Sequence, residues 1–409
     1  MNVLVINPGG NSLKAEIVSC DPNQKSASEA RYLKSVIVEG IGKEGKLSEY
    51  NGKAITHSES IDAPDYETAS AKIFEWLQSH LASPSISDYQ LVGVRVVHGG
   101  SRFSGPVEIT PDVEREIIEF EKWAPLHNQR SIEILPAIRQ RFPGVPTFAV
   151  FDTAFHRTIP DFAGTYAIPY ELSQKHEIRR YGFHGISHRY LMERYAHLSG
   201  RTPQSLKLVT MHLESGCSVT AIAQGHSVDN TMGLTPLEGL MMGTRSGDVD
   251  PALIPFLAHA EGIEIDEVMK ILNKKSGLLG VSGVSLDTRV LVKQYDSNAR
   301  VKLAMEMFAY RVLKAVGAYL CALGGADAVV FGGGIAENTM IFRERVCAGL
   351  RWCGLEIDEE QNRKLIDIEG RLSTASSRLQ AWVIPVEEGL QIAHECCQAA
   401  EGARSSQAA

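Results

Sequence analysis

An apolar strand that runs into a glycine or small-residue turn is the local pattern that most constrains the fold of this chain. Residues 3–6 form one such strand, and the turn NPGGNS at 7–12 leads into a second strand at 13–18. Residues 206–213, the turn ESGC and residues 218–223 repeat this arrangement. A hairpin of this kind can turn its backbone amides toward an anion, unlike a Walker-type loop, which opens a helix. Two such hairpins predict a duplicated architecture, with one phosphate loop per domain.

A third strand, at residues 328–331, leads into the turn GGGIAEN at 332–338 and then into a helix. Such a turn lets a nucleotide approach the backbone closely. Between these landmarks we expect short strands in residues 31–57. We expect helices at 69–81, 114–121 and 131–141, with the segment APLHN (124–128) between the last two.

Two arginines stand where a charged side chain needs a ligand or a partner. Arg245 lies in TPLEGLMMGTRSGDVDP among small residues, so its planar guanidinium can hold carboxylate or phosphate oxygens. A solvated surface turn is the alternative. Arg95 interrupts the apolar strand 91–97, which suits either a small carboxylate with a short alkyl group or a structural ion pair. Asp152 follows the strand 147–151, at the end where ligand sites of α/β proteins gather.

His184 lies between glycines in the aromatic segment RRYGFHG. A lone histidine is usually structural, but a glycine-flanked one in an aromatic loop is a better candidate for a site. The sequence alone leaves both roles open.

Length and composition describe an ordinary globular enzyme of two domains. The chain has 409 residues, 44% hydrophobic and 22% charged. A net charge of −8 gives no support to binding of nucleic acid or of an anionic membrane. The seven cysteines are scattered and odd in number, which fits reduced thiols in a cytoplasmic protein. We find no secretory signal at the N-terminus and no apolar run long enough to span a bilayer.

Over almost its whole length the chain resembles acetate kinases. The resemblance is carried by VLVINPGGNSLK, RVVHGG, APLHN, FDTAFH, RRYGFHGISHRY, TPLEGLMMGTRSGDVDP, NKKSGLLGVSG and IPVEEGLQIA. It implies reversible formation of acetyl phosphate and ADP from acetate and ATP, with Mg²⁺ (or Mn²⁺) as the cofactor. It also implies a homodimer.

The fold implied by this resemblance is α/β, a two-domain actin-like ATPase (ribonuclease H-like) fold with the active site in the cleft between the domains. Residues 1–152 would form the N-terminal domain, and the helix at 388–409 would pack back on it. Residues 153–387 would form the nucleotide-binding domain.

The family's site residues carry over motif by motif. Arg95, Asp152, His184 and Arg245 would be catalytic. The acetate pocket would be formed by Arg95, Val97, Leu126, Phe183 and Pro236. Asn7 and Glu388 would hold the metal. The nucleotide would lie against Asn11, Ser12, Lys14, His212, Glu214, Ser215, Gly216, Asp287, Thr288, Arg289, Gly332, Gly333, Gly334, Ile335, Ala336 and Asn338.

Four places depart from the family pattern. The second turn, usually HLGNG, here has Glu214 and Ser215. The first turn has Pro8 and Asn11 in place of alanine and serine. The third has Ala336 in place of glycine, and Val386 and Glu387 precede Glu388 in the late motif. A carboxylate beside a polyphosphate predicts weakened or altered use of the phosphoryl donor. A kinase for propionate or another short-chain acid and a degenerate, non-catalytic nucleotide-binding protein are the alternatives.

Overall fold

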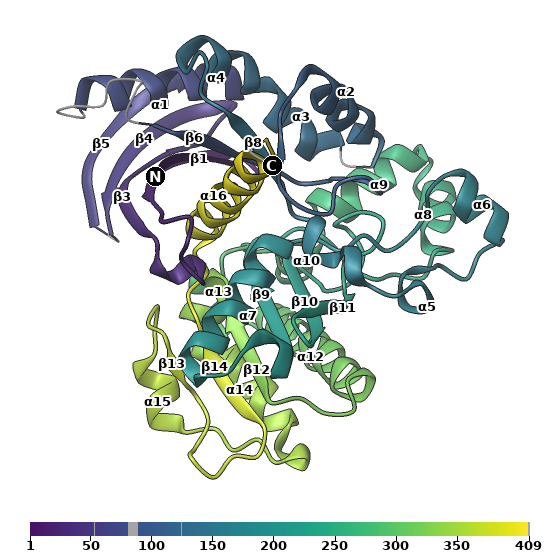
Figure 1. The fold of residues 1–409 in the computed structure, drawn as a ribbon. Coiled ribbons are helices and arrows are strands. Elements are labelled where there is room, and N and C mark those ends of the chain that lie inside the picture. Colours follow the sequence, from purple (N-terminus) through teal and green to yellow (C-terminus); the bar gives the residue numbers. More distant parts are fainter. Residues whose placement is uncertain (53, 81–88, 124, 408–409) are drawn as a thin grey trace. The chain divides into compact units, whose positions relative to one another are not determined.

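The structure is a computed structural model that describes residues 1–52, 54–80, 89–123 and 125–407. Its described residues divide into two compact units (Figure 1). The first comprises Met1–Phe155, Gly185–Tyr190 and Glu387–Ala409, and the second comprises His156–His184 and Leu191–Val386.

The first unit is built on one mixed sheet. Its described strands follow the order β5-β4-β3-β2-β1-β6-β8-β7. The strands are β1 (Asn2–Pro8), β2 (Ser12–Ser19), β3 (Arg31–Glu39), β4 (Lys43–Asn51), β5 (Ala54–Ala63), β6 (Leu91–Val96), β7 (Val107–Glu108) and β8 (Thr147–Phe151). The helices are η1 (Ala27–Glu29), α1 (Tyr66–His80), α2 (Pro111–Glu119), η3 (Phe120–Lys122), α3 (Pro125–Glu133), α4 (Leu135–Arg141) and α16 (Glu388–Gln407).

Helices cover both faces of this sheet because its central strands are buried on both sides. One set of alternating side chains, among them Leu4, Ile6, Val92 and Val94, belongs to a core cluster that includes α1 and α4. On the opposite face α16 packs against β1 and β6 (Figure 1). There Gly93 lies so close to the helix that a β-carbon would come within 2.8 Å of the Cys396 Sγ.

The second unit contains a sheet whose described strands follow the order β11-β10-β9-β12-β14-β13. The strands are β9 (Lys207–Leu213), β10 (Cys217–Ala223), β11 (His226–Asn230), β12 (Ala328–Gly332), β13 (Gly370–Arg371) and β14 (Gln380–Val383). The helices are α5 (Asp161–Gly164), α6 (Tyr170–Lys175), η5 (Pro203–Ser205), α8 (Leu253–Glu261), α9 (Ile265–Lys274), α10 (Gly277–Ser282), α11 (Thr288–Val292), α12 (Ala299–Ala322), α13 (Gly334–Asn338), α14 (Met340–Gly349), η6 (Arg351–Cys353) and α15 (Glu359–Lys364). The elements η4 (Ala154–Thr158) and α7 (Gly185–Ser199) run from one unit into the other.

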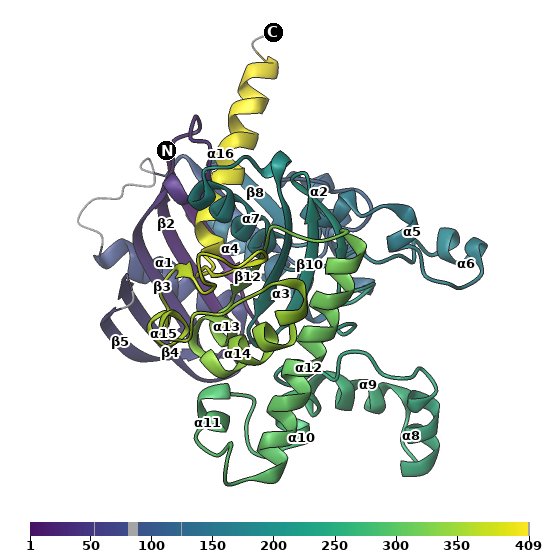
Figure 2. The same cartoon turned by 90° about the horizontal axis from the view of Figure 1, so that it is seen from below.

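The two sheets share the same central order. In the first, the hairpin β1–β2 is antiparallel, and β1, β6 and β8 run parallel. In the second, β9–β10 is antiparallel, and β9, β12 and β14 run parallel. This correspondence confirms the duplicated architecture that the two hairpins predict. In the second unit, the long helix α12 packs against β10 and β9 (Figure 2).

One local expectation is wrong. The segment at 124–128, expected between helices, lies largely in α3, which begins at Pro125. Proline is well tolerated in the first turn of a helix, where the amide has no intrahelical acceptor. The helical stretch instead breaks at Ile134, because Pro136 in the first turn of α4 cannot continue the hydrogen-bond ladder of α3.

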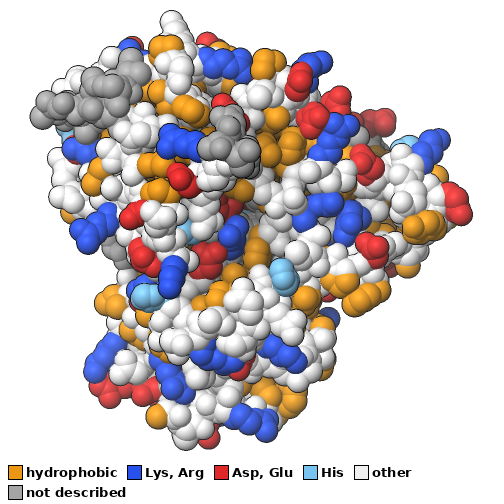
Figure 3. Space-filling view, in the orientation of Figure 1, with side chains coloured by type: hydrophobic (Ala, Val, Ile, Leu, Met, Phe, Trp, Pro, Cys, Tyr) orange, Lys and Arg blue, Asp and Glu red, His pale blue; other side chains and the backbone are white. Residues whose placement is uncertain are grey.

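Charged side chains of both signs are interspersed on the face shown in Figure 3. Among the helices described, none is both long and apolar enough to cross a membrane.

Candidate active-site residues in each unit

Polar side chains gather at one edge of the first sheet. Asn7, Arg95 and Asp152 stand at or just after the carboxyl ends of the parallel strands β1, β6 and β8. Because parallel strands end on the same edge, these three side chains meet there, at the usual position of ligand sites in α/β sheets.

Arg95 is held in a fixed direction by this cluster. Its Nε and Nη2 donate to the Asp152 Oδ1 and Oδ2 over 2.9 and 2.6 Å, and its Nη1 donates to the Asn7 Oδ1 over 3.2 Å. Asp152 is 1% exposed, so this fork-like pair is largely withdrawn from water. The structural ion pair that the sequence left open is therefore present. A role for Arg95 in binding substrate stays a prediction.

Glu388, the first residue of α16, joins the same cluster. Its Oε2 accepts a hydrogen bond from the Asn7 Nδ2 over 2.9 Å, and its Oε1 accepts from the Ser187 hydroxyl. The sequence predicts Asn7 and Glu388 as metal ligands, and the structure places them side by side. A carboxylate and an amide oxygen are hard donors of the kind that Mg²⁺ prefers.

The described residues contain no group of three or more His, Cys, Asp or Glu side chains arranged to hold a metal ion. The Asn7 amide oxygen and the Glu388 carboxylate are donors that suit Mg²⁺, which commonly takes further ligands from substrate phosphates and water.

Two side chains hold the backbone of the first turn. The Gly9 carbonyl accepts a hydrogen bond from the Tyr66 hydroxyl over 2.8 Å and one from the Arg130 Nη1 over 2.9 Å. The guanidinium of Arg130 also lies 5.5 Å from the centre of the Tyr66 ring. These contacts fix the backbone of the turn that carries Asn11 and Ser12.

Lys14 forms an ion pair in the first unit. Its Nζ lies 2.7 Å from the Glu16 Oε1. Burial raises the pKa of Glu16, although the positive charge of Lys14 opposes that shift. A contact between Lys14 and a nucleotide, which the resemblance implies, is not tested by this ion pair.

In the second unit, His184 has a left-handed backbone conformation, and its ring is held by a hydrogen bond. Its backbone φ of 57° is left-handed, and it precedes the first turn of α7. The Nδ1 hydrogen-bonds with the Ser218 hydroxyl over 2.9 Å, and the ring centre lies 4.4 Å from that of His212. Residues from two segments, the loop before α7 and the hairpin β9–β10, therefore meet at this point.

Gly216 lies where these histidines and Arg245 come together. A β-carbon at this position would be 3.3 Å from the His184 ring and 3.6 Å from the Arg245 Nη1. The Arg245 Nη1 donates to the Pro236 carbonyl over 2.9 Å. The structure thus brings His184, His212, Gly216 and Arg245 into one cluster; their roles in catalysis and nucleotide binding stay predictions.

The predicted methyl pocket is described in part. Val97 and Phe183 are buried. The Phe183 carbonyl lies 2.9 Å from the His156 Nε2. Burial lowers the pKa of His156 to about 4, so this ring is neutral at pH 7. The side chain of Leu126 lies outside the described part of the structure.

Glu214 projects from the second turn, with 62% of its side chain exposed. Its Oε2 lies 3.6 Å from the His212 Nε2. A β-carbon added to Gly334 would lie 4.0 Å from the Glu214 Cγ, so the Glu214 side chain lies beside the third turn. The adjoining Ser215 is exposed. The substituted turn and the predicted nucleotide turn are therefore neighbours.

The third turn is anchored by a carboxylate that the sequence did not single out. The Glu337 Oε1 accepts hydrogen bonds from the Gly333 amide over 2.7 Å and the Val386 amide over 3.1 Å. Burial raises the pKa of Glu337 to about 7. Ile335 and Ala336, which the resemblance places against the nucleotide, are buried.

Asp287, Thr288 and Arg289 lie close to this turn through one contact. The Thr288 hydroxyl lies 3.1 Å from that of Thr339, just after α13. Asp287 caps α11 and pairs with Arg289 over 2.8 Å. The Asp287–Arg289 hydrogen bond lowers the pKa of the Asp287 carboxyl.

Sequence reasoning missed several positioning residues. Ser187 and Ser218 fix Glu388 and His184, and Tyr66 and Arg130 fix the first turn. Ser187 lies in the motif GFHGISH and could have been suspected. The other partners are distant in sequence, so only the fold could identify them.

Comparison with known proteins places the chain in a family. Residues 2–394 match the Acetokinase family. The acetate kinase of Chloroherpeton thalassium is 43% identical and that of Solibacter usitatus 45% identical. The alignments cover 97% of this chain in both cases, and 98% and 97% of the two relatives.

Solved structures agree. The acetate kinase of Porphyromonas gingivalis superposes with a TM-score of 0.88 at 38% identity, over 97% of this chain and 98% of that one. A propionate kinase from Francisella tularensis gives 0.87 at 36% identity, over 96% of this chain and 98% of that one. This likeness confirms the expected α/β fold of the actin-like ATPase class.

Proposed function

The chain belongs to the acetokinase family and is a phosphotransferase with a carboxyl group as acceptor; from this we propose that it transfers the γ-phosphoryl group of ATP reversibly to acetate, giving acetyl phosphate and ADP. The transfer is direct and in line, without a covalent enzyme intermediate. Acetate arrives ionised at neutral pH, so the reaction needs no general base. Catalysis then rests on positioning and on neutralisation of charge.

In the first unit, Arg95 binds the acetate carboxylate. Asp152 holds the guanidinium by two hydrogen bonds, so little side-chain freedom remains to be lost when acetate binds. Val97 offers a buried apolar side chain to the methyl group.

In the second unit, Arg245 and His184 stabilise the phosphoryl group during transfer. The Pro236 carbonyl directs the Arg245 guanidinium, and the Ser218 hydroxyl directs the His184 ring. Donors that are fixed before the reaction stabilise developing charge without a further cost of reorganisation. Phe183 and Pro236 are the apolar residues of this unit that the resemblance assigns to acetate.

A kinase that uses ATP is expected to need a divalent metal, and we propose that Asn7 and Glu388 hold Mg²⁺. The bound cation would neutralise phosphate charge. Ser187 and Asn7 keep the Glu388 carboxylate in place through their hydrogen bonds.

The observation that carries this proposal is the paired anchoring of the two arginines. Each predicted anion-binding guanidinium is directed by a defined acceptor, Asp152 for Arg95 and the Pro236 carbonyl for Arg245. A degenerate binding protein has no need to keep both arrangements together with His184 and Glu388.

The test is an assay of acetyl phosphate formation with acetate, Mg²⁺ and a panel of phosphoryl donors. Formation that requires both ATP and acetate supports the proposal. Nucleotide binding without turnover for any short-chain acid would favour a non-catalytic homologue.

Propionate is the second candidate acceptor, because a propionate kinase of solved structure shares 36% identity and the same fold. One methylene in an apolar pocket discriminates by about 1–3 kcal/mol. We expect the parent to prefer acetate and the variant Val97→Ala to shift the ratio of kcat/KM values toward propionate. A parent that already prefers propionate would contradict the assignment of Val97 to the methyl pocket.

We also propose that the chain forms a homodimer. Large apolar side chains are exposed on short helices of the second unit, among them Phe162 (91%), Tyr170 (62%) and Phe256 (67%). Exposed apolar side chains of this size are typical of interaction surfaces. Light scattering should show a dimer for the parent. The double variant Phe162→Ser with Phe256→Ser should dissociate at a higher protein concentration than the parent does. A monomeric parent would contradict this.

A further inference from the structure

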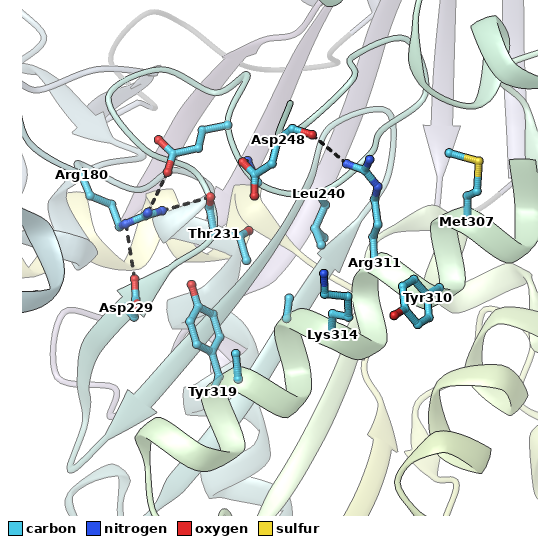
Figure 4. Close-up of a pocket in the computed structure, with 14 residues that line it drawn as sticks. Arg180, Asp229, Thr231, Leu240, Asp248, Met307, Tyr310, Arg311, Lys314 and Tyr319 are labelled. Carbon is cyan, nitrogen blue, oxygen red and sulfur yellow. Dashed lines mark hydrogen bonds and ion pairs between the residues drawn. The ribbon is translucent and has the colours of Figure 1, made fainter. Parts of the chain in front are cut away.

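Arg180 holds together the segment that precedes the Arg245 loop. Its Nη1 donates to the carbonyls of Asn230, Thr231 and Met232 over 2.7, 3.1 and 3.3 Å. Its Nη2 donates to the Glu238 Oε1 over 2.7 Å. Figure 4 shows this guanidinium between the end of β11 and the loop. One side chain therefore fixes both ends of the segment 230–238.

Glu238 is held on its other side as well. Its Oε2 accepts a hydrogen bond from the Tyr166 hydroxyl, whose oxygen in turn accepts one from the Leu234 amide over 2.8 Å. The carboxylate and the phenol fill the space beside Gly233, where any β-carbon would overlap them. The path of the segment is thus defined by polar contacts.

Pro236 lies between the two anchored ends. Its carbonyl accepts the hydrogen bond from the Arg245 Nη1, at 2.9 Å. The position of this carbonyl therefore depends on Arg180 and Glu238, which act on Arg245 through the segment 230–238.

An open pocket of about 680 Å³ lies beside the loop, lined by Glu238, Gly239, Leu240 and Asp248 on one side and by side chains of α12 on the other (Figure 4). Glu238 therefore borders this pocket and not a close-packed core that would direct its side chain by steric contact. The hydrogen bonds with Arg180 and Tyr166 set the direction of its carboxylate.

We infer that Arg180 and Glu238 are a positioning pair for the phosphoryl-transfer reaction and act by fixing the direction of the Arg245 guanidinium. This inference rests on the proposed function. A displacement of about 1 Å in a group that stabilises the transition state is enough to cost a hundredfold in rate. Breaking the pair should therefore lower kcat and leave the KM for acetate much less affected.

The experiment compares Glu238→Gln with a matched control, Glu369→Gln. Glu369 also pairs with an arginine of its own unit, Arg194, by two hydrogen bonds of 2.7 and 2.8 Å. The two pairs have similar exposure, 20% and 29% for Arg180 and Glu238 against 23% and 27% for Arg194 and Glu369. Parent activity is measured first, so that a chain without acetyl phosphate formation refutes the proposed function and not this inference.

We expect Glu238→Gln to lower kcat roughly ten- to hundredfold and Glu369→Gln to leave it within about twofold, at similar losses of thermal stability. In an Arg245→Lys background, Glu238→Gln should have little further effect on kcat, because contacts that act through one group are not additive. An equal loss in both backgrounds, or a parent-like kcat, would overturn the inference.

If the turnover of Arg245→Lys is too slow to measure, a crystal structure of Glu238→Gln tests the inference. The Arg245 Nη1 should have left the Pro236 carbonyl. An unchanged hydrogen bond between these two atoms would overturn the inference.

Discussion

The two hairpin turns share a scaffold but differ in what holds them and in the charge that they carry. In the first unit, the turn between β1 and β2 is fixed by Tyr66 and Arg130 through the Gly9 carbonyl. In the second, the turn between β9 and β10 carries an exposed carboxylate, Glu214, paired with His212 at 3.6 Å.

The two turns have the same strand pairing but different side chains. Strand pairing alone produces both turns, because the same antiparallel and parallel neighbours recur in each sheet. The side chains on each turn are set independently of that pairing. A duplicated fold therefore allows the charge on one turn to change without altering the other turn.

The largest expected effect tests one arginine in each unit. Arg95→Ala and Arg245→Ala should each lower kcat roughly 100- to 1000-fold, since each removes a charge that stabilises the transition state. The two variants should differ in their free energy of unfolding. Loss of Arg95 breaks a buried ion pair, which costs about 3–5 kcal/mol, whereas Arg245 donates to a neutral carbonyl. Steady-state kinetics and urea unfolding measure both.

Exposed Arg201, paired with Asp327 in the second unit, supplies the control. Arg201→Ala should change kcat by less than about twofold. Turnover of Arg95→Ala or Arg245→Ala within a few-fold of the parent would remove that arginine from the proposed mechanism.

Glu337 gives the second unit a dependence of stability on pH. Its pKa is about 7 in the folded chain against an ordinary 4.5. Between these values the folded state keeps a proton that the unfolded state loses, so this group lowers the free energy of unfolding as pH rises from about 4.5 to about 7. The total is roughly 3 kcal/mol.

Glu337→Gln should abolish that dependence, because a glutamine Oε1 can still accept from the Gly333 and Val386 amides. The variant should match the parent near pH 5 and exceed its stability at pH 8. Urea unfolding at both pH values measures this, and parallel stability curves would mean that Glu337 does not titrate in this range.

Changing the charge of the second turn should have a smaller effect, on donor use. Glu214 is mostly exposed, so its repulsion of a nearby phosphate is about 1 kcal/mol at water-like screening. We expect Glu214→Gly with Ser215→Asn to lower the KM for ATP about fivefold.

The first turn supplies the matched control for this change. Asn11→Ser should change the KM for ATP less than the double substitution does, because it alters no charge. If the double-substituted and parent proteins use ATP with equal kcat/KM, the carboxylate on the second turn has no effect on donor use.

The smallest expected effect concerns the clamp under the first turn. Tyr66→Phe removes one of the two hydrogen bonds to the Gly9 carbonyl and should cost about 1 kcal/mol of stability. Because Arg130 still holds the carbonyl, the KM for ATP should change little. A large rise in that KM would show that the clamp also shapes the donor site.

Local sequence patterns predicted the elements that build both sheets. The strand expected at 147–151 is β8, and both hairpins lie where expected. Residues 334–338, expected as part of a turn, form the short helix α13 instead. Apolar side chains that repeat along a buried strand and glycines that permit tight turns are local signals, so they survive without knowledge of the fold.

Resemblance to a family, rather than local pattern, selected Glu388 and Asn7 as neighbours. They are 381 positions apart, and only the return of α16 to the first sheet brings their side chains within 2.9 Å. The break at Ile134 was missed because the local pattern is ambiguous: a proline can begin a helix as readily as it ends one.

The sequence by itself determined which residues can carry charge and where strands turn. Only the tertiary structure decided which of those charges are already paired: Arg95 with Asp152, Lys14 with Glu16, and Arg180 with Glu238. The physical reason is that the direction of a side chain depends on its partner. In this chain, the partners that direct Arg95 and Arg180 lie 57 and 58 positions away.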